Sequence, residues 1–249
     1  MIASQTNKTV KMLRSLHEKK GREKENAFLI EGAKFVAEIT SDWDVSHVIT
    51  ASGYKGQLPK FDNCVFLTLD DDLFTIVSDT KAPQGILAVV KKPSFSISDM
   101  QGHVFMLEEM NDPGNLGTVL RTCHGLNISG IILSPNCVDI YSPKVVRSSA
   151  GSIFHIPHVQ MCLKQAMTEL KSRGALVYAT LPRADKALYE FDLCKPAAFL
   201  FGSEHGGLKA ETAALADESI SIPSLAESLN VSMCASIVAY EALRQGLTK

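Results

Sequence analysis

The stretch HVFMLEEMNDPGNLGTVLRTCHGLNISGIIL, residues 103–133, decides the fold of this chain. It contains two continuous apolar runs, 104–107 and 131–133, separated by the turn-forming residues 111–114 and a short helical pattern. Apolar runs this short, bounded by Asn, Asp, Pro and Gly, are typical of strands that are covered on both faces. The stretch therefore predicts a strand, a turn, a helix and a second strand of an α/β domain.

The helix in this stretch is predicted to begin near Leu116, with Asn115 as its N-cap, and to end at Asn127 in a left-handed conformation. Its apolar face consists of Leu116, Leu120 and Cys123. Arg121 lies off that face and need not be buried. Because α/β proteins usually bind ligands at the carboxyl ends of parallel strands, Asn115 and Arg121 lie where chemistry is expected.

Two later stretches have the same strand-to-loop form. FLFGSEHGGL, 199–208, leads into Gly202 and Glu204, and ISIPSLAESLNVSMCASIVAYEAL, 220–243, leads into a helix that opens around Asn230. Together with residues 103–133 they resemble motifs 1, 2 and 3 of the SpoU/TrmH family of SPOUT RNA ribose methyltransferases. Such a resemblance predicts that the three loops meet at one site.

The resemblance implies an α/β fold with two domains. Residues 101–249 would form a SPOUT-type S-adenosylmethionine-dependent methyltransferase domain with a deep trefoil knot, which no local pattern predicts. Residues 1–95, through FLIEG (28–32) and APQGILAVV (82–90), look like the family's small RNA substrate-binding domain, which resembles a ribosomal-protein fold. Pro93–Ser98 is the predicted linker between the two domains.

The resemblance also implies the site residues. The residues that match the family's catalytic positions are Asn115, Arg121, Glu204 and Asn230. The positions expected to hold S-adenosylmethionine, largely through main-chain groups, are Thr180, Gly202, Ile222 and Leu229. Arg121 would act either as a general base or as a fixed cation, and we favour the cation because a guanidinium holds its proton very tightly.

The charge of the chain is uneven. Residues 1–24 carry seven basic and two acidic side chains, whereas the rest of the chain carries 18 basic and 25 acidic ones. This pattern predicts either an RNA-binding arm or a solvated helix. A second basic segment, DIYSPKVVRSSAGSIFHIP at 139–157, is similar to the family segment that borders the nucleic acid. With no acid nearby in sequence, we favour phosphate contact there over plain surface charge. The predicted RNA-binding residues are Lys11, Arg14, Arg22, Lys144 and Arg147.

Hydrophobic periodicity predicts the remaining elements. Residues 5–19 form a helix with a stripe of Val10, Leu13 and Leu16, and Lys19–Glu25 forms a polar linker. Predicted strands are 27–30, 45–49, 64–67, 86–90, 176–179, 197–201 and 220–222, and predicted helices are 31–39, 70–77, 143–151, 162–173 and 209–216. The last helix, 229–243, is apolar around most of its surface, and because SPOUT proteins are dimers we expect it to form a homodimer interface.

Several functional classes are excluded or disfavoured. Neither GxGxxG nor GxxxxGK[ST] occurs, which excludes the usual dinucleotide fold and P-loop hydrolases. No membrane-length apolar run and no secretory signal are found, and six scattered cysteines predict reduced core residues of a cytoplasmic protein. His155 and His158 are predicted to be packing or surface residues rather than metal ligands, and the reaction needs no metal. The loop after Ile222 is shorter than in the family and lacks its glycine, so the alternative is a catalytically weak RNA-binding or RNA-chaperone protein. A base methyltransferase fits the motifs less well.

Overall fold

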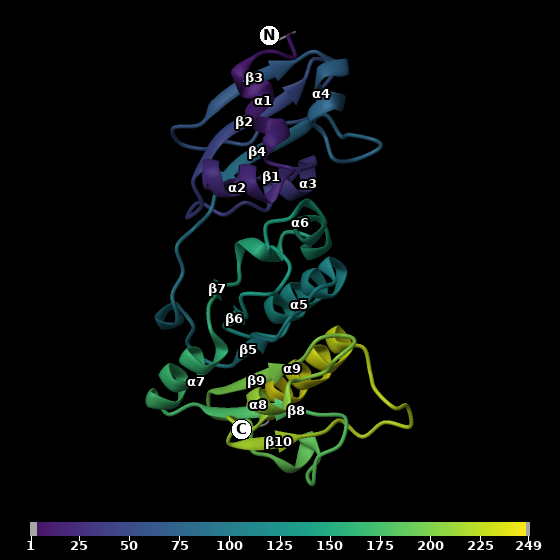
Figure 1. The fold of residues 1–249 in the computed structure, drawn as a ribbon. Coiled ribbons are helices and arrows are strands. Elements are labelled where there is room, and N and C mark those ends of the chain that lie inside the picture. The colour runs from purple at the N-terminus through teal and green to yellow at the C-terminus, as the bar shows by residue number, and fades with distance from the viewer. Residues whose placement is uncertain (1–3, 248–249) are drawn as a thin grey trace. The chain divides into compact units, whose positions relative to one another are not determined.

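The structure is a computed structural model, and it describes residues 4–247. The chain divides into two compact units. The first contains the residues up to Ser94 together with Asp139–Phe154, and the second contains Phe95–Val138 together with the residues from His155 onward. Residues 139–154 therefore group with the first unit, although the predicted second domain contains them in sequence. Figure 1 labels the elements of both units.

The first unit is built on a four-stranded sheet with the order β1-β4-β2-β3, in which only β2 and β3 are parallel. Its strands are β1 (Ala27–Glu31), β2 (Val45–Ala51), β3 (Val65–Leu69) and β4 (Ile86–Lys91). Its helices are α1 (Lys8–Ser15), α2 (Lys19–Glu25), α3 (Ala33–Ala37), α4 (Asp71–Val77), α6 (Pro143–Ser149) and the 3-10 turn η2 (Ser152–Phe154). Val10, Leu13 and Leu16 are fully buried against this sheet, which confirms the predicted stripe.

One helix of the first unit was predicted as a linker. Residues Lys19–Glu25 form α2, whose buried residues are Gly21 and Arg22 rather than apolar side chains. A Cβ atom on Gly21 would lie 1.9 Å from the carbonyl oxygen of Ser15, so only glycine fits there. Because no apolar periodicity marks this helix, a local pattern search takes it for a loop.

The side chain of Arg22 joins two distant parts of the first unit. Its Nη2 and Nε atoms lie 2.7 Å and 2.8 Å from Oδ2 of Asp139, and its Nη1 donates to the carbonyl oxygens of Leu16 and His17. Arg22 is 3% exposed, so an RNA phosphate has no access to it. The prediction that Arg22 binds RNA is therefore wrong, and its role is structural.

Aromatic rings add to the attachment of residues 139–154 within the first unit. The ring of Phe28 lies 4.8 Å from that of Tyr141, and the ring of Trp43 lies 5.1 Å from that of Phe154. Nε1 of Trp43 also donates to the carbonyl oxygen of Phe154 at 3.0 Å. These buried contacts explain why residues 139–154 group with a sheet that lies far away in sequence.

Replacing Asp139 with alanine is expected to lower the free energy of unfolding by about 3 kcal/mol, because it leaves the buried Arg22 guanidinium without its counter-charge. Denaturant unfolding of the full chain measures this loss. Asp62→Ala, on an exposed turn of the same unit, is the matched control and should change stability by less than about 0.5 kcal/mol. Equal stability of the two variants would show that the ion pair does not hold residues 139–154 in place.

The second unit is built on a six-stranded, all-parallel sheet with the order β10-β8-β9-β5-β6-β7. Its strands are β5 (Val104–Leu107), β6 (Gly130–Leu133), β7 (His158–Gln160), β8 (Leu176–Thr180), β9 (Ala197–Phe201) and β10 (Glu218–Ile220). Its helices are α5 (Pro113–Gly125), α7 (Leu163–Ser172), α8 (Ala210–Ala213), α9 (Val231–Leu247) and the 3-10 turns η1 (Ile97–Asp99) and η3 (Leu188–Glu190).

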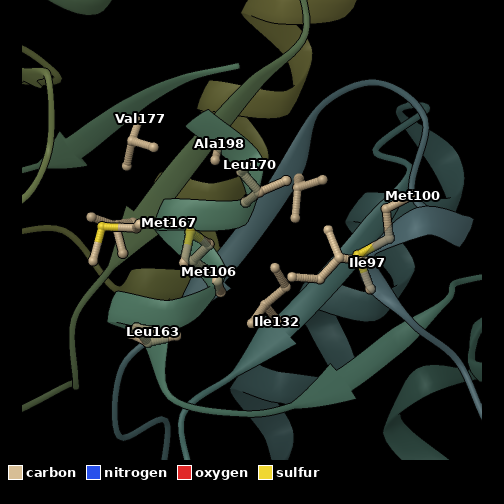
Figure 2. Packing of buried hydrophobic residues seen from close by; sticks show 12 residues of the cluster. Ile97, Met100, Met106, Ile132, Leu163, Met167, Leu170, Val177 and Ala198 are labelled. Carbon is tan, nitrogen blue, oxygen red and sulfur yellow. The ribbon is translucent and has the colours of Figure 1, made fainter. Parts of the chain in front are cut away.

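Alternate residues of the central strands cover the two faces of this sheet. On one face Met106 and Ile132 pack with Leu163, Met167 and Leu170 of α7, as Figure 2 shows. Ile97 and Met100 join the same cluster, so the predicted linker Pro93–Ser98 is partly built into the second unit. On the other face Phe105, Phe199, Phe201 and Tyr178 form a row of ring contacts. The strands are buried on both faces, as their apolar runs predict.

Three details of the structure differ from the predictions. The helix α5 begins at Pro113 with Asp112 as its N-cap, so Asn115 is not the cap. Strand β10 lies at Glu218–Ile220, which leaves Ile222 in the following loop. All six cysteines are free, but only Cys123 and Cys137 are buried, so the prediction that most are core residues is wrong. Asn127 takes the predicted left-handed conformation, with φ of 59°. Within residues 4–247 no helix is long and apolar enough to cross a membrane.

The buried His158 on β7 should make the stability of the fold depend on pH. Burial lowers its pKa from 6.5 to about 4, while its Nδ1 donates to the carbonyl oxygen of Ile156. The unfolded chain therefore binds a proton that the folded chain rejects, so stability contributed by the neutral ring is complete above pH 6.5 and is lost as the pH falls towards 4. We expect a loss of about 3 kcal/mol across this window.

Denaturant unfolding of the wild type and of His158→Asn between pH 7 and pH 4 measures this effect. Asparagine keeps a donor near the Ile156 carbonyl but does not titrate. The variant should therefore lose less stability than the wild type on acidification. Parallel curves for the two proteins would contradict the assignment to His158.

Candidate active site

The loops at the carboxyl ends of neighbouring parallel strands of the second unit line one cavity of about 850 Å³. Residues from the exits of β8, β9 and β10 and from the start of α9 contribute to its wall. All four residues predicted to hold the cofactor line it, namely Thr180, Gly202, Ile222 and Leu229. Glu204 and Asn230 line it as well. The structure therefore brings together residues that lie as far apart in sequence as Thr180 and Cys234, as expected at the open edge of a parallel sheet.

The exit of β9 is a tight hairpin. Ser203 and Gly207 exchange two backbone hydrogen bonds of 3.0 Å, which folds residues 203–207 back over the end of the strand. A Cβ atom on Gly202 would lie 2.0 Å from the carbonyl carbon of Gly207 and from the nitrogen of Leu208. Main chain meets main chain at this point, so glycine is the only residue that lets the hairpin close.

Three of the predicted catalytic side chains form one hydrogen-bonded chain. The amide nitrogen Nδ2 of Asn115 donates to Oε1 of Glu204 at 2.9 Å, and Nδ2 of Asn230 donates to Oδ1 of Asn115 at 3.1 Å. The three residues come from α5, from the β9 hairpin and from the residue that precedes α9. This network fixes the Glu204 carboxylate at the cavity wall, because each of its members is held by a different element.

Local helix chemistry leaves these amides available. Oδ1 of Asp112 accepts from the backbone nitrogen of Asn115 at 2.8 Å, so the side chain of Asn115 is not needed for capping. Oδ1 of Asn230, in contrast, accepts from both the backbone nitrogen and the hydroxyl of Ser232, at 2.9 Å and 2.6 Å. Asn230 therefore caps α9 with its oxygen and uses its nitrogen for the network.

The fourth predicted catalytic residue, Arg121, lies apart from the cavity wall. It is exposed on α5, as predicted, while Leu116, Leu120 and Cys123 are fully buried on the opposite face. Within residues 4–247 it makes no hydrogen bond or ion pair and does not line the cavity. Arg121 lies six positions after Asn115 on α5, which corresponds to about 9 Å along the helix axis. Its guanidinium is directed to solvent and is available to a ligand.

The hydroxyl of Thr180 has a structural partner. It donates to the carbonyl oxygen of Leu200 at 2.5 Å and so joins the ends of β8 and β9. The loop 223–228 is shorter than the loop that the family resemblance predicts. It forms part of the cavity wall through Ser224, Ala226, Glu227 and Ser228. These loop residues are exposed, and Leu225 projects fully into solvent.

Two of the cavity residues that were not predicted from the sequence have side chains that could take part in chemistry. Arg183, in the loop after β8, and Cys234, on α9, both line the cavity. Burial raises the pKa of the Cys234 thiol, which makes it a poor nucleophile at neutral pH. The signal for Arg183 was present in the sequence, because LPR follows a buried strand directly. Cys234 lies in the first turns of an apolar helix, and no local sequence pattern marks it as a cavity residue.

The predicted RNA-binding residues all belong to the first unit, because residues 139–154 group with it. Lys11, Arg14 and Lys144 are exposed. Arg147, however, forms an ion pair with Asp79, a residue 68 positions away in sequence. The argument that no acid lies near this segment is therefore wrong for Arg147, and an RNA phosphate would have to compete with that carboxylate.

Within the described residues no group of three or more His, Cys, Asp or Glu side chains has the arrangement to hold a metal ion. The ring of His155 stacks on that of His124 with centroids 4.1 Å apart, and His158 is buried. Both histidines therefore have packing contacts of the kind that the sequence predicts. The cavity is lined by main-chain turns, amides, carboxylates and a guanidinium instead.

Comparison with known proteins agrees with this geometry. The model of the SpoU rRNA Methylase family matches residues 102–240, and that of the MRM3-like substrate binding domain matches residues 7–88. The chain is 33% identical over 244 residues to the 23S rRNA (guanosine(2553)-2'-O)-methyltransferase RlmP of Bacillus subtilis, covering 96% of this chain and 97% of that protein. It is 39% identical over 148 residues to the tRNA (guanosine(18)-2'-O)-methyltransferase of Thermus thermophilus, covering 57% of this chain and 74% of that protein.

A solved structure is similar over nearly the whole chain. The crystal structure of the SpoU methyltransferase AviRb from Streptomyces viridochromogenes, in complex with the cofactor AdoMet (S-adenosylmethionine), has a TM-score of 0.87 and 25% sequence identity, and the match covers 97% of this chain and 99% of that chain. The family model spans more than half of the sequence, and the Bacillus subtilis relative is alike along almost all of it. The chain therefore belongs to the SpoU rRNA methylase family.

Proposed function

We propose that this protein transfers a methyl group from S-adenosylmethionine to a ribose 2'-hydroxyl of ribosomal or transfer RNA. The observation that carries this proposal is the chain of hydrogen bonds through Asn230, Asn115 and Glu204 at the wall of a cavity formed by the strand exits. The Bacillus subtilis and Thermus thermophilus relatives described above are named as enzymes that methylate the 2'-oxygen of a guanosine, in 23S rRNA and in tRNA respectively. Which of these RNA classes this chain modifies is part of the proposal.

The cavity fits S-adenosylmethionine. Its volume of about 850 Å³ is in the range of sites that hold cofactor-sized ligands. Gly202, Ile222 and Leu229 line the cavity, and in this proposal their backbone groups would hold the adenine. When bound, the cofactor supplies a methyl carbon already activated by the positive charge on sulfur. The protein then has to align the ribose oxygen and to assist the loss of its proton.

The residues of the network have distinct tasks in this proposal. Asn115 and Asn230 are neutral and hold the carboxylate of Glu204 at a fixed place, from which it can accept a hydrogen bond from the ribose. Arg121 acts as a fixed cation that binds the neighbouring phosphate and lowers the free energy of the developing alkoxide. The guanidinium is a poor general base, because it holds its proton very tightly.

RNA is recognised by the first unit in this proposal. Residues 7–88 match a substrate binding domain, and Lys11, Arg14 and Lys144 of the same unit are exposed cations that suit phosphate contact. Arg147 joins them if a phosphate displaces Asp79. The binding should therefore weaken steeply as the salt concentration rises.

We further propose a homodimer that forms through α9 of the second unit. This helix buries Ala235, Val238, Ala239 and Ala242 within the unit. On its other side Met233, Ile237 and Tyr240 are 57%, 38% and 59% exposed, which leaves an apolar face without cover in the single chain. The helix α5, which carries Arg121, packs against α9, so Arg121 lies close to the proposed contact between subunits. Its guanidinium would then reach the RNA ribose either at the rim of its own cavity or across this contact.

The trefoil knot implied by the resemblance belongs to the same proposal, as does a cytoplasmic location beside the RNA substrate. The TM-score of 0.87 along almost the whole chain supports a shared path of the backbone with a SpoU methyltransferase. Stretching single molecules by their two ends tests the knot, because a knotted chain stops short of the length of a fully extended one.

Calorimetric titration with S-adenosylmethionine separates the enzyme from the rival, a catalytically weak RNA-binding protein. An enzyme should bind the cofactor with a dissociation constant in the micromolar range, which corresponds to a binding free energy of about −8 kcal/mol. A protein that merely chaperones RNA shows no heat of binding. The short loop 223–228 favours the rival, whereas the cavity that this loop helps to form favours the enzyme.

A further inference from the structure

Glu108 has an unusual place at the exit of β5. It is 7% exposed, and both of its carboxylate oxygens are engaged by a segment about 100 residues away. Oε2 accepts from the backbone nitrogen of Lys209 at 2.8 Å, and Oε1 accepts from the hydroxyl of Thr212. Burying this carboxylate costs free energy, and removing it would leave the two buried donors without an acceptor. Glu108 therefore holds in place the segment that carries Lys209 and Thr212.

The partners belong to the segment that ends the β9 hairpin. Leu208, which lines the cavity, is followed directly by Lys209, the N-cap residue of α8. The helix α8 has only four residues, Ala210–Ala213, and a helix of one turn cannot hold itself in place. The hairpin is fixed at Gly202 by β9, and its other end is fixed where Glu108 binds Lys209 and Thr212.

The neighbouring Glu109 makes a different kind of contact. It takes the left-handed conformation, with φ of 51°, and its side chain binds Nζ of Lys209 at 2.6 Å and Nδ2 of Asn136 at 3.1 Å. These groups are exposed to solvent, and the Glu109 side chain is 29% and that of Lys209 48% exposed. An exposed ion pair contributes little to stability, so Glu109 holds Lys209 in place less firmly than Glu108 does.

We propose that Glu108 is a positioning residue for the cofactor site. Its buried carboxylate holds the segment that directly follows the 203–207 hairpin, and this fixes the position of Glu204 and the shape of the cavity. This inference rests on the proposed function, since it concerns how the site binds S-adenosylmethionine. Glu108 itself touches neither the cavity nor the predicted catalytic side chains.

The test is calorimetric binding of S-adenosylmethionine to the full-length wild type, Glu108→Ala, Glu108→Gln and Thr212→Val. Glu108→Ala should raise the dissociation constant about tenfold, because the nitrogen of Lys209 and the hydroxyl of Thr212 both lose their acceptor. Glu108→Gln should recover binding to within about threefold of the wild type, since an amide oxygen accepts from Lys209 and an amide nitrogen donates to Thr212. Thr212→Val should give an intermediate loss and serves if Glu108→Ala does not fold.

Glu109→Gln is the matched control: it changes the adjacent carboxylate, which binds the same lysine at the surface, and should leave the dissociation constant unchanged. A merely structural role would lower the thermal midpoint of Glu108→Ala without changing cofactor binding at 25 °C or the KM for the cofactor relative to that for RNA. Wild-type binding by both Glu108→Ala and Thr212→Val overturns the inference. Absence of binding by the wild type itself would instead overturn the proposed function.

Discussion

Replacing Arg121 with alanine is expected to lower kcat for RNA methylation by about 10²–10³-fold and to leave the dissociation constant of S-adenosylmethionine unchanged. Arg121 is exposed on α5 and does not line the cavity. Its replacement should therefore remove a charge that contacts the RNA and leave every contact with the cofactor in place. Single-turnover kinetics with saturating RNA measure the chemical step directly.

Two further variants complete this test of Arg121. Arg121→Lys keeps the charge but loses the planar fork, so it should recover only part of the rate. Lys164→Ala removes another exposed cation of the same unit, on α7 and away from α5 and α9, and should behave as the wild type. A rate for Arg121→Ala within about twofold of the wild type would exclude both the cation and the base role, since each predicts at least a tenfold loss.

Replacing Gly202 with alanine should weaken cofactor binding about 100-fold while the rest of the second unit stays folded. The added Cβ atom would lie 2.0 Å from backbone atoms of Gly207 and Leu208, and backbone cannot move aside as a flexible side chain can. Opening the hairpin to relieve this clash should cost about 3 kcal/mol, which corresponds to an increase of about 100-fold in the dissociation constant.

Gly125→Ala is the matched control for this variant, because a Cβ atom at the end of α5 would meet no atom within 4 Å. Binding by Gly125→Ala should equal that of the wild type, with stability slightly increased by the better helix former. Tight binding by Gly202→Ala would mean that the hairpin does not form the wall of the cofactor site. Circular dichroism shows whether each variant is folded.

Mixing the two inactive variants shows which subunit Arg121 serves. If the protein is a dimer and Arg121 acts on the partner subunit, a mixed dimer of Arg121→Ala and Gly202→Ala contains one cavity that is intact and is served by an intact arginine. Such dimers regain activity. If Arg121 acts within its own chain, neither subunit of the mixed dimer is complete, and the mixture stays inactive.

The parts of the fold that the sequence predicts well are those with strong local patterns. The apolar runs at 104–107, 131–133 and 197–201 coincide with β5, β6 and β9, because strands buried on both faces cannot contain polar residues. The predicted helix 70–77 coincides with α4 and its N-cap Asp70, whose side chain accepts from the backbone nitrogen of Asp72. The motif residues Asn115, Glu204 and Asn230 are brought together, although their hydrogen bonds to one another could not be predicted from spacing.

The parts that the sequence does not predict depend on distant partners. The helix α2 buries Gly21 and Arg22 in place of apolar residues, and the reason for Arg22 is Asp139, 117 positions further along the chain. The same separation hides the grouping of residues 139–154 with the first sheet. The side-chain amide of Asn115 suits a helix cap, but α5 is capped by Asp112, which is followed by Pro113 at the first helical position.

Isotope labelling tests most directly whether the methyl group reaches a ribose 2'-oxygen. Incubation of the protein with ribosomal RNA or transfer RNA and S-adenosylmethionine carrying a deuterated methyl group, followed by nuclease digestion and mass spectrometry, identifies where the label resides. The account predicts a labelled nucleoside whose base is released unlabelled, which places the methyl on the sugar. A label that stays with the free base would contradict it.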